Sequence, residues 1–258
     1  MQELQVYNWL HATDPSDLHE RSCDTYEPGT GEWLFRSPSW DSWLKEKTRC
    51  LWVHGIPGAG KTIFASHLIE TARDYCMDRG SGYACVYYYC YFGHAQDETA
   101  PLLKWTLLEL CRQVGRVPLA VYKLYRHGGT PSPRALMTAL EQVVQAFHRV
   151  FIFIEAVDES LHRENLLRVI QDLATDQRFK NLRVLATSRE VRTPFYLPTR
   201  CQRHTRIVVV ELIILSAFST STSRRSCRAS RYRYLCEITS WTETLPSTSV
   251  QSSRLTAG

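Results

Sequence analysis

The stretch "GIPGAGKT", from Gly55 to Thr62, has residue types and a spacing that suit phosphate binding. It matches the P-loop pattern, G-x4-G-K-[ST]. Glycines let backbone N–H groups approach phosphate oxygens closely, while the lysine reaches the β- and γ-phosphates and the hydroxyl ligates Mg²⁺. The sequence therefore predicts a site for a nucleoside triphosphate, ATP or GTP, with Mg²⁺. The residues expected to hold the nucleotide are Gly55, Pro57, Gly58, Ala59, Gly60, Lys61, Thr62 and Ile63, and Thr62 is also an expected metal ligand.

An accidental match in a glycine-rich turn is the alternative to phosphate binding. From average residue frequencies, the pattern would occur by chance in roughly one chain in a hundred of this size. Here an apolar run precedes the motif and a helical pattern follows it, which is the context that P-loops require. The following helix also offers its positive N-terminal end to the phosphates. We therefore favour phosphate binding.

Three acidic residues follow a second apolar run, in "VFIFIEAVDES" at residues 150–160. Alone, they would indicate a strand with a solvated, charged end. A P-loop, however, needs an acid at the end of a neighbouring strand to hold hydrated Mg²⁺, and another to position the attacking water. We therefore expect Glu155 to face the metal and Asp158 and Glu159 to serve catalysis. Glu159 is the better candidate for polarising water.

Polar residues also end the next apolar run, in "ATSRE" at residues 186–190. Thr187 or Ser188 is a candidate for contact with the γ-phosphate or its water. Arg189 is a candidate for sensing phosphate charge through its planar guanidinium group, and it completes the expected catalytic set. A capped strand end with an exposed arginine explains the same residues equally well.

Alternating strand and helix patterns must position these residues. Short apolar runs and amphipathic segments alternate between residues 50 and 200, which predicts an α/β fold with a mainly parallel sheet. Functional loops then lie at the carboxyl ends of the strands. The expected strands are 50–55, 83–92, 149–155 and 182–188, and the expected helices are 61–76, 100–114, 133–148 and 163–176.

The segments on either side of this core differ from it in composition. Residues 1–49 are expected to form a lead-in with a short helix at 3–10, followed by a Gly/Pro/Thr turn region and aromatic residues. Trp33, Trp40 and Trp43 are expected to anchor the lead-in on the 50–200 core. Residues 201–215 are a candidate last strand. The tail at 216–258, rich in Ser, Thr and Arg, is expected to be poorly structured.

Composition excludes several other classes of function. The net charge is +5, but residues 1–200 carry 23 basic and 23 acidic side chains, so no nucleic-acid partner is indicated. Nine scattered cysteines, without a zinc-like Cys/His spacing, indicate reduced thiols in a cytoplasmic protein. The start lacks the pattern of a secretory signal. The longest apolar stretch near the C-terminus, "IVVVELIIL", is about half of the length that a membrane span requires, and Glu211 interrupts it.

Five segments together resemble the NACHT-type NTPase domain in its nephrocystin-3-like N-terminal form, common in fungal signalling proteins of the STAND class. The resemblance covers about residues 5–200. It implies a three-layer P-loop NTPase sandwich of the ASCE type, and a switch driven by ATP or GTP with slow hydrolysis. It also implies nucleotide-dependent self-association. The segments are "GTGEWL" (29–34), "SWDSWL" (39–44), "LWVHGIPGAGKT" (51–62), "IFIEAVDES" (152–160) and "VLATSR" (184–189).

Two departures from the family pattern bear on function. The family usually has Asp where this chain has Glu155, so we expect binding to survive while hydrolysis weakens, because the carboxylate lies one methylene further out. The family also continues with a further strand and a helical lid. Here "RHTRIVVVE" is the candidate strand, and we expect the tail to reflect a truncated or frame-disrupted gene product.

Three other functions were weighed against the switch. A nucleotide-binding or scaffold fragment without turnover would show the same motifs. A small-molecule kinase is disfavoured because it does not need the Asp158–Glu159 pair. A GTPase of the common type is disfavoured because the chain lacks an Asn-Lys-x-Asp motif.

Overall fold

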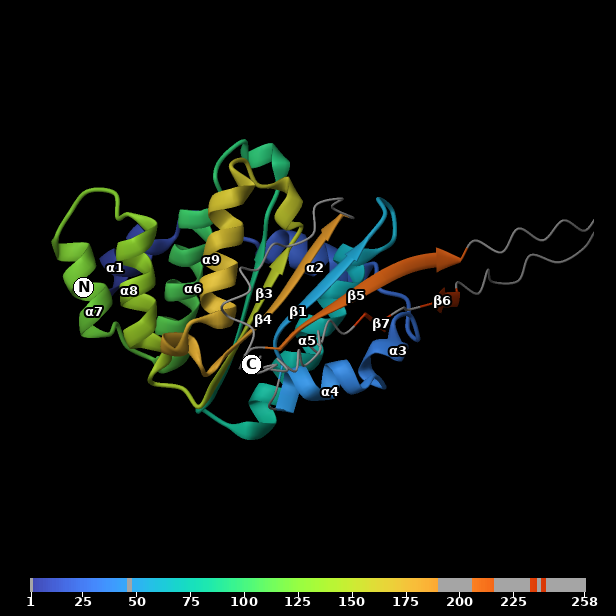
Figure 1. The fold of residues 1–258 in the computed structure, drawn as a ribbon. Coiled ribbons are helices and arrows are strands. Elements are labelled where there is room, and N and C mark those ends of the chain that lie inside the picture. The colour runs from blue at the N-terminus through green and yellow to red at the C-terminus, as the bar shows by residue number, and fades with distance from the viewer. Residues whose placement is uncertain (1, 46–47, 190–205, 216–232, 236–237, 240–258) are drawn as a thin grey trace, which may run out of the picture.

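A mostly parallel sheet with helices on both faces forms the centre of the molecule (Figure 1). The computed structural model describes residues 2–45, 48–189, 206–215, 233–235 and 238–239. Among these residues, no helix is both long enough and apolar enough to cross a membrane.

The strands follow the order β2-β3-β4-β1-β5-β6, and β7 also pairs with β5. The pairs from β2 to β5 are parallel, whereas β6 and β7 run antiparallel to β5. The four strands predicted in the core are confirmed, with ends shifted by up to three residues. The strands are β1 (Thr48–Gly55), β2 (Tyr83–Tyr89), β3 (Arg149–Glu155), β4 (Leu182–Arg189), β5 (Arg206–Leu215), β6 (Arg233–Leu235) and β7 (Ile238–Thr239).

Helices cover both faces of the sheet, so the central strands are buried on both sides. Alternate strand residues contribute to two apolar clusters, one on each face, which makes this a three-layer α/β sandwich. The first face carries α1 (Gln2–Leu10), α6 (Thr99–Val114), α7 (Leu119–Arg126), α8 (Pro133–Val144) and α9 (Arg163–Thr175). The second carries α2 (Ser16–Asp24), α3 (Glu32–Phe35), α4 (Pro38–Lys45) and α5 (Lys61–Arg79). Short 3₁₀ turns are η1 (Phe92–His94), η2 (Val157–Glu159) and η3 (Gln177–Phe179).

The predicted core helices are confirmed, but some end elsewhere than expected. Helix α8 begins at Pro133, where the Ser132 side chain accepts a hydrogen bond from the Ala135 N–H at 3.3 Å. It ends at Val144, where the Asn181 side chain donates hydrogen bonds to the carbonyl oxygens of Val144 and Phe147 at 2.6 and 3.0 Å. Helix α7 was not predicted, since its eight residues are too few for a clear periodicity.

The lead-in packs on the sheet more extensively than the sequence indicates. Val6 and Leu10 of α1 are fully buried on the first face. On the second face, Trp43 is buried and its indole N–H donates to the Val184 carbonyl at 2.9 Å. Trp40 is also buried, and Trp33 stacks on a phenylalanine of α5. The predicted tryptophan anchors are confirmed. The prediction of a turn region was wrong for α2, and the helices α3 and α4 in the aromatic segment were not predicted.

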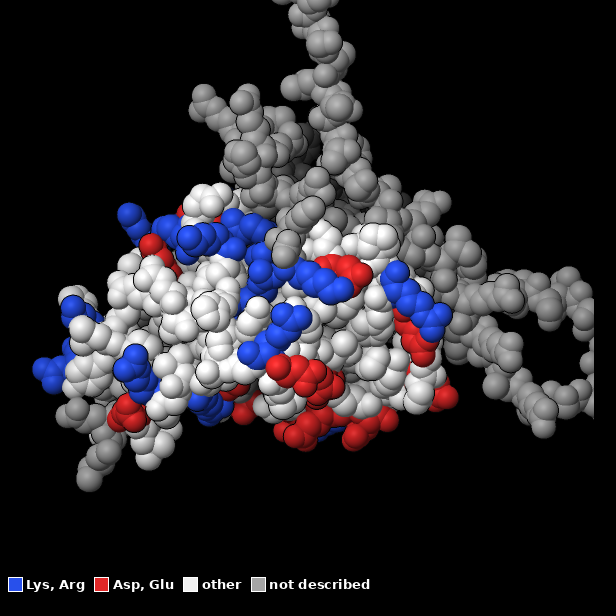
Figure 2. All heavy atoms as spheres, turned by 90° about the horizontal axis from the view of Figure 1, so that it is seen from below, with Lys and Arg blue, Asp and Glu red and all other residues white. Residues whose placement is uncertain are grey.

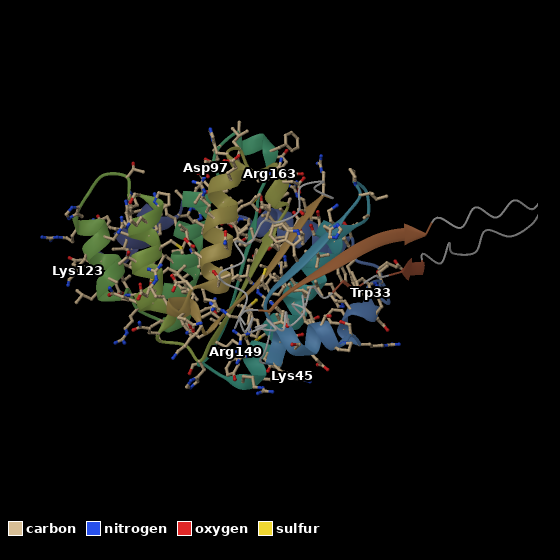
Figure 3. The ribbon with its side chains drawn as sticks, viewed as in Figure 1. Trp33, Lys45, Asp97, Lys123, Arg149 and Arg163 are labelled. Carbon is tan, nitrogen blue, oxygen red and sulfur yellow. The ribbon has the colours of Figure 1, made fainter. Side chains whose placement is uncertain are left out.

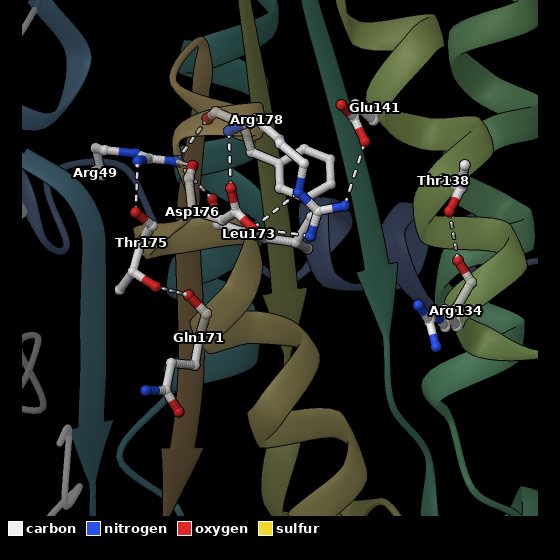
Figure 4. A network of polar contacts seen from close by, with 10 residues as sticks. Arg49, Arg134, Thr138, Glu141, Gln171, Leu173, Thr175, Asp176 and Arg178 are labelled. Atoms are coloured by element: carbon white, nitrogen blue, oxygen red, sulfur yellow. Dashed lines mark hydrogen bonds and ion pairs between the residues drawn. The ribbon is translucent and has the colours of Figure 1, made fainter. Parts of the chain in front are cut away.

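A buried arginine organises the amino end of the sheet (Figure 4). The Arg49 side chain, only 7% exposed, donates to the carbonyl oxygens of Leu173, Asp176 and Phe179 at 3.0, 2.8 and 2.7 Å. These carbonyls lie at the end of α9 and in the adjoining turn, where backbone acceptors lack helical partners. Arg49 therefore ties β1 to α9 at the end of the molecule opposite the functional loops.

The two ends of the sheet carry different residues. Figure 3 labels Lys45 and Arg149 where strands begin, and Asp97 and Arg163 at the end toward which the parallel strands point. Figure 2 views the molecule from the side of the strand starts. There, basic side chains lie in separate groups among neutral and acidic ones, not in one continuous field.

The C-terminal expectations fall partly outside the described residues. Within the candidate strand at 201–215, the structure describes β5, at Arg206–Leu215, parallel to β1. Of the tail at 216–258, the structure describes two short strands, β6 and β7, which the composition did not predict. The rest of the tail, and residues 190–205 before β5, lie outside the described part of the chain.

Candidate nucleotide site

The loop between β1 and α5 carries the "GIPGAGKT" motif, as predicted. Gly58 and Gly60 have φ values of +79° and +75°, a region that residues with a Cβ rarely adopt. A Cβ added at Gly58 would meet no atom within 4 Å, so backbone conformation, and not crowding, accounts for glycine there. The loop ends at Gly60, the N-cap of the 19-residue helix α5.

Several backbone N–H groups of this loop are available to a ligand. The N–H of Ala59 donates to the Ile56 carbonyl at 3.2 Å. Among the described residues, the N–H groups of Gly58, Gly60, Lys61 and Thr62 have no acceptor. Such N–H groups at the start of a helix, together with the helix dipole, favour a bound anion. The loop therefore offers the donors that a phosphate group requires.

The Lys61 ammonium group folds back over the loop. It donates to the carbonyl oxygens of Gly55 and Ile56 at 2.8 and 3.0 Å. Burial lowers the pKa of Lys61, while the nearby Asp158 and Glu155 carboxylates oppose that shift. The nearby acids and carbonyl oxygens therefore offset only part of the cost of removing the ammonium group from water.

The two residues expected to face the metal are in direct contact. The Thr62 hydroxyl, at the start of α5, donates to Glu155 Oε1 at 2.7 Å. Glu155 is the last residue of β3 and is only 4% exposed. Burial raises its pKa to about 7, and Glu159 adds to the shift, while the bond from Thr62 opposes it. The sheet thus brings together residues that lie far apart in the sequence.

Of the two polar candidates at the end of β4, only Thr187 faces this corner. Its hydroxyl accepts a hydrogen bond from the Ala156 N–H at 2.9 Å, and a hydrogen bond from Thr187 helps to stabilise the charged form of Glu155. The Ser188 hydroxyl instead accepts from the Trp52 indole at 3.0 Å, in the buried core. The two residues point to opposite faces of the strand, as successive residues do.

Arg189 lies against both catalytic candidates. Its Nε and Nη2 atoms are each 3.2 Å from a carboxylate oxygen, of Asp158 and Glu159 respectively. Its backbone N–H also donates to Asp158 at 2.8 Å. The Arg189 side chain is 55% exposed, whereas that of Asp158 is 9% exposed. The expected catalytic set is therefore one cluster, held by the turn η2 and the end of β4.

Sequence reasoning missed the loop between β2 and α6, which borders this cluster. The Phe92 N–H donates to Glu159 at 3.2 Å, and the Glu98 N–H donates to the Ser160 hydroxyl at 3.1 Å. Glu98 is fully buried and accepts from the Tyr88 hydroxyl; His94 Nδ1 lies 2.7 Å from its other oxygen. The only signal in the sequence was a polar stretch after a strand, which equally fits an exposed loop.

The sheet order and the P-loop together define an α/β fold of the P-loop NTPase type. β4 lies between the P-loop strand β1 and the acidic strand β3, and all three strands are parallel. The P-loop and the acidic turn therefore lie at the same edge of the sheet, where these strands end. No curated protein matches the chain.

Several solved structures are similar to part of the chain. Cdc6p from Pyrobaculum aerophilum is 14% identical with a TM-score of 0.46, over 69% of this chain and 43% of that one. The ORC1 protein of Aeropyrum pernix, solved in complex with DNA, is 15% identical with a TM-score of 0.41, over 71% and 43%. The chain spans less than half of the length of these structures.

The sequence profile of one protein family matches most of the site. It is described as nephrocystin 3, N-terminal, and it matches residues 29–189. The match includes the P-loop, the acidic turn η2 and all of β4. It also covers well over half of the 258 residues. The chain belongs to the nephrocystin 3 N-terminal family.

Proposed function

We propose that the chain binds a nucleoside triphosphate, ATP or GTP, with Mg²⁺ and acts as a nucleotide-dependent switch with slow hydrolysis. One observation carries this proposal. The Thr62 hydroxyl and the Glu155 carboxylate, the expected ligands on the P-loop helix and on β3, meet at 2.7 Å. A metal held between a hydroxyl and a nearby carboxylate is the usual arrangement beside a P-loop.

The geometry of the loop supports phosphate binding. The N–H groups without acceptors at Gly58, Gly60 and Thr62 would donate to phosphate oxygens. Lys61 would exchange its two carbonyl contacts for the β- and γ-phosphates, where its charge is better compensated. Pro57, Ala59 and Ile63 would shape the loop and the first turn of α5.

The residues at this corner suit Mg²⁺. Both expected protein ligands are oxygen atoms, which Mg²⁺ prefers, and it usually takes only one or two such ligands beside phosphates and waters. When bound, Mg²⁺ neutralises charge on the phosphates. Glu155 must be ionised to serve the metal, and its raised pKa of about 7 means that metal binding would release a proton.

Slow hydrolysis is consistent with the contacts of Glu159. Its carboxylate already contacts Arg189 and the Phe92 N–H, both at 3.2 Å. These contacts would hold the carboxylate away from an attacking water until it turns from Arg189. Arg189 would still be paired with Asp158, so it would approach the γ-phosphate only when that second ion pair also opens.

A nucleotide-binding fragment without turnover is the second candidate function. It is favoured by Glu155, which stands where the family usually has Asp, and by the ion pair between Glu159 and Arg189. In that case nucleotide would bind at the same loop, but the arginine and the acids would stay paired.

The wider context is part of the same proposal. We place the protein among cytoplasmic STAND-type signalling switches, with self-association through the NTPase domain. Because α1 to α4 pack on the sheet, we propose that residues 2–45 and 48–189 fold as one unit.

The two functions differ in a phosphate-release assay on protein that has bound ATP and Mg²⁺. The switch predicts slow release, which rises in Glu155→Asp because the carboxylate regains the family's length. The fragment predicts binding without release, in wild type and in this variant. If wild type binds no triphosphate at all, both functions are excluded.

A further inference from the structure

Three metal-ligating side chains converge between α2 and α5, on the second face of the sheet. His19 and Cys23 lie one turn apart on α2, and Glu70 comes from α5. One ligand atom from each residue lies within 4.8 Å of the other two. We propose that His19, Cys23 and Glu70 form a binding site for Zn²⁺, which fastens the lead-in to the P-loop helix.

One of the three distances between ligand atoms already matches a tetrahedral site, and the other two lie within 4.8 Å. With bonds of about 2.0–2.3 Å, ligand atoms around Zn²⁺ lie roughly 3.3–3.7 Å apart. Cys23 Sγ is 3.7 Å from His19 Nε2, which fits without movement. Glu70 Oε1 is 2.7 Å from the same nitrogen, a hydrogen-bond distance. The Glu70 side chain is 43% exposed, so it can move back by the remaining distance.

The imidazole ring is held as ligating histidines usually are. His19 is only 3% exposed, and its ring lies 4.2 Å from that of Tyr87. Its second nitrogen, Nδ1, is 3.0 Å from the Tyr89 hydroxyl. A partner on the second nitrogen fixes the orientation of a ligating histidine. The structure thus holds Nε2 toward Cys23 and Glu70.

The donor set selects among cations. Thiolate with imidazole suits Zn²⁺, whereas Mg²⁺ prefers oxygen ligands only. On binding, the metal takes the place of the proton between His19 Nε2 and Glu70, that proton moves to Nδ1 by exchange with solvent, and the thiol proton of Cys23 passes to solvent. The Tyr89 hydroxyl then accepts from Nδ1. Arg73, now 2.9 Å from Glu70 Oε1, retains its position over the Tyr87 ring, at 5.0 Å.

The site would connect the lead-in to the nucleotide loop. Helix α5 starts with Lys61 and carries Glu70 further along the same helix, while Tyr89 pairs in register with Glu155. A metal bound here would fix α2 against α5, the helix that begins at Lys61, and next to the strand residue that pairs with Glu155. The sequence showed no zinc-like spacing, because the third ligand is an acid far along the chain.

Metal titration of the full-length protein tests the proposal. Zn²⁺ is titrated against the nucleotide-free protein in excess Mg²⁺, which occupies oxygen-only sites, and the experiment is repeated with Cys23→Ser and Glu70→Gln. Glu20→Gln, at an exposed position of α2, is the matched control. Co²⁺ serves as a second probe, because a thiolate ligand gives it a charge-transfer absorption band.

We expect one Zn²⁺ per chain, with affinity reduced at least about tenfold in Cys23→Ser and in Glu70→Gln and unchanged in Glu20→Gln. The Co²⁺–thiolate band should disappear in Cys23→Ser. Circular dichroism establishes that each variant is folded. The proposal is overturned if wild type binds no Zn²⁺ under these conditions, or if folded Cys23→Ser binds it as tightly and retains the cobalt band.

Discussion

At the residue scale, Glu155 combines burial with an expected role that needs a negative charge. Its carboxyl group is 4% exposed and receives a hydrogen bond from Thr62 at 2.7 Å. Burial dominates, however, and raises its pKa to about 7. In the ligand-free protein near neutral pH, this residue therefore exchanges between its protonated and ionised forms.

The raised pKa predicts a specific dependence of stability on pH. An acid whose folded pKa is raised binds its proton more tightly in the folded state, so its contribution to stability is greatest below about pH 4.5. That contribution is lost as pH rises to about 7, and amounts to on the order of 3 kcal/mol. Denaturant unfolding of ligand-free wild type and Glu155→Gln at several pH values measures it. A difference in unfolding free energy that stays constant across this range would contradict the assignment.

Glu159 is the residue on which turnover depends in this account. Glu159→Gln keeps the size of the side chain and its contact with the Phe92 N–H, but removes the charge that polarises water. We expect hydrolysis to fall at least about a hundredfold, with nucleotide affinity changed little. Glu164→Gln, at an exposed position of α9, is the control. If Glu159→Gln releases phosphate as fast as wild type, Glu159 does not polarise the water.

The sequence predicted the location of the site better than its internal contacts. A P-loop after one strand and an acid at the end of another must meet at one edge of a parallel sheet, as Lys61, Thr62 and Glu155 do. The ion pairs of Arg189 with Asp158 and Glu159 could not be predicted, because they depend on the side-chain rotamers that these three residues adopt in the folded protein. Likewise, nothing local indicated that Glu98 would be buried.

At the element scale, the end of α9 depends on a side chain from β1. Arg49 donates to carbonyl oxygens at the end of α9 and in η3, and its charge would be costly to bury without them. The end of a helix that depends on a side chain from a distant segment cannot be predicted from the local sequence. The short helices α2, α3 and α4 were missed for the same reason, whereas the longer amphipathic helices α5 and α6 have a periodicity that predicts them.

Replacing Arg49 tests this arrangement. Arg49→Met keeps most of the length of the side chain but removes the guanidinium donors from these carbonyl oxygens. We expect a loss of about 2–4 kcal/mol in the free energy of unfolding, measured by denaturant titration. Arg36→Met is the matched control. Its side chain is 79% exposed and, within the described part of the chain, pairs only with Glu32, so its loss should be under about 1 kcal/mol. Equal losses in the two variants would contradict the role given to Arg49.

At the scale of the whole molecule, the lead-in spans both faces of the sheet. Helix α1 packs on the first face and α2 contacts α5 on the second. The edge strand β2 lies at the end of the sheet order. Sheet edges are usually covered or otherwise protected. The segment between α1 and α2 passes from one face of the sheet to the other. The lead-in therefore contributes to both apolar clusters of the fold that carries the nucleotide site.

Two leucines of α1 test this integration. Leu10 is fully buried, whereas Leu4 is 64% exposed. We expect Leu10→Ala to lower the free energy of unfolding by about 2–5 kcal/mol in one cooperative transition, and Leu4→Ala to lower it by less than about 0.5 kcal/mol. Denaturant unfolding, followed by tryptophan fluorescence and circular dichroism, measures both. A small loss for Leu10→Ala, or separate transitions, would show that the lead-in is independent of the core.

The central claim is that the P-loop binds a nucleoside triphosphate through Lys61, and direct binding tests it. Calorimetric titration of ATP and GTP with Mg²⁺ is compared among wild type, Lys61→Ala and Lys123→Ala. Lys123 is exposed on α7, on the far side of the molecule (Figure 3). We predict that wild type and Lys123→Ala bind equally, and that Lys61→Ala loses at least about tenfold in affinity, since a charge-assisted contact is removed. No binding by wild type, or unchanged binding by Lys61→Ala, would contradict the claim.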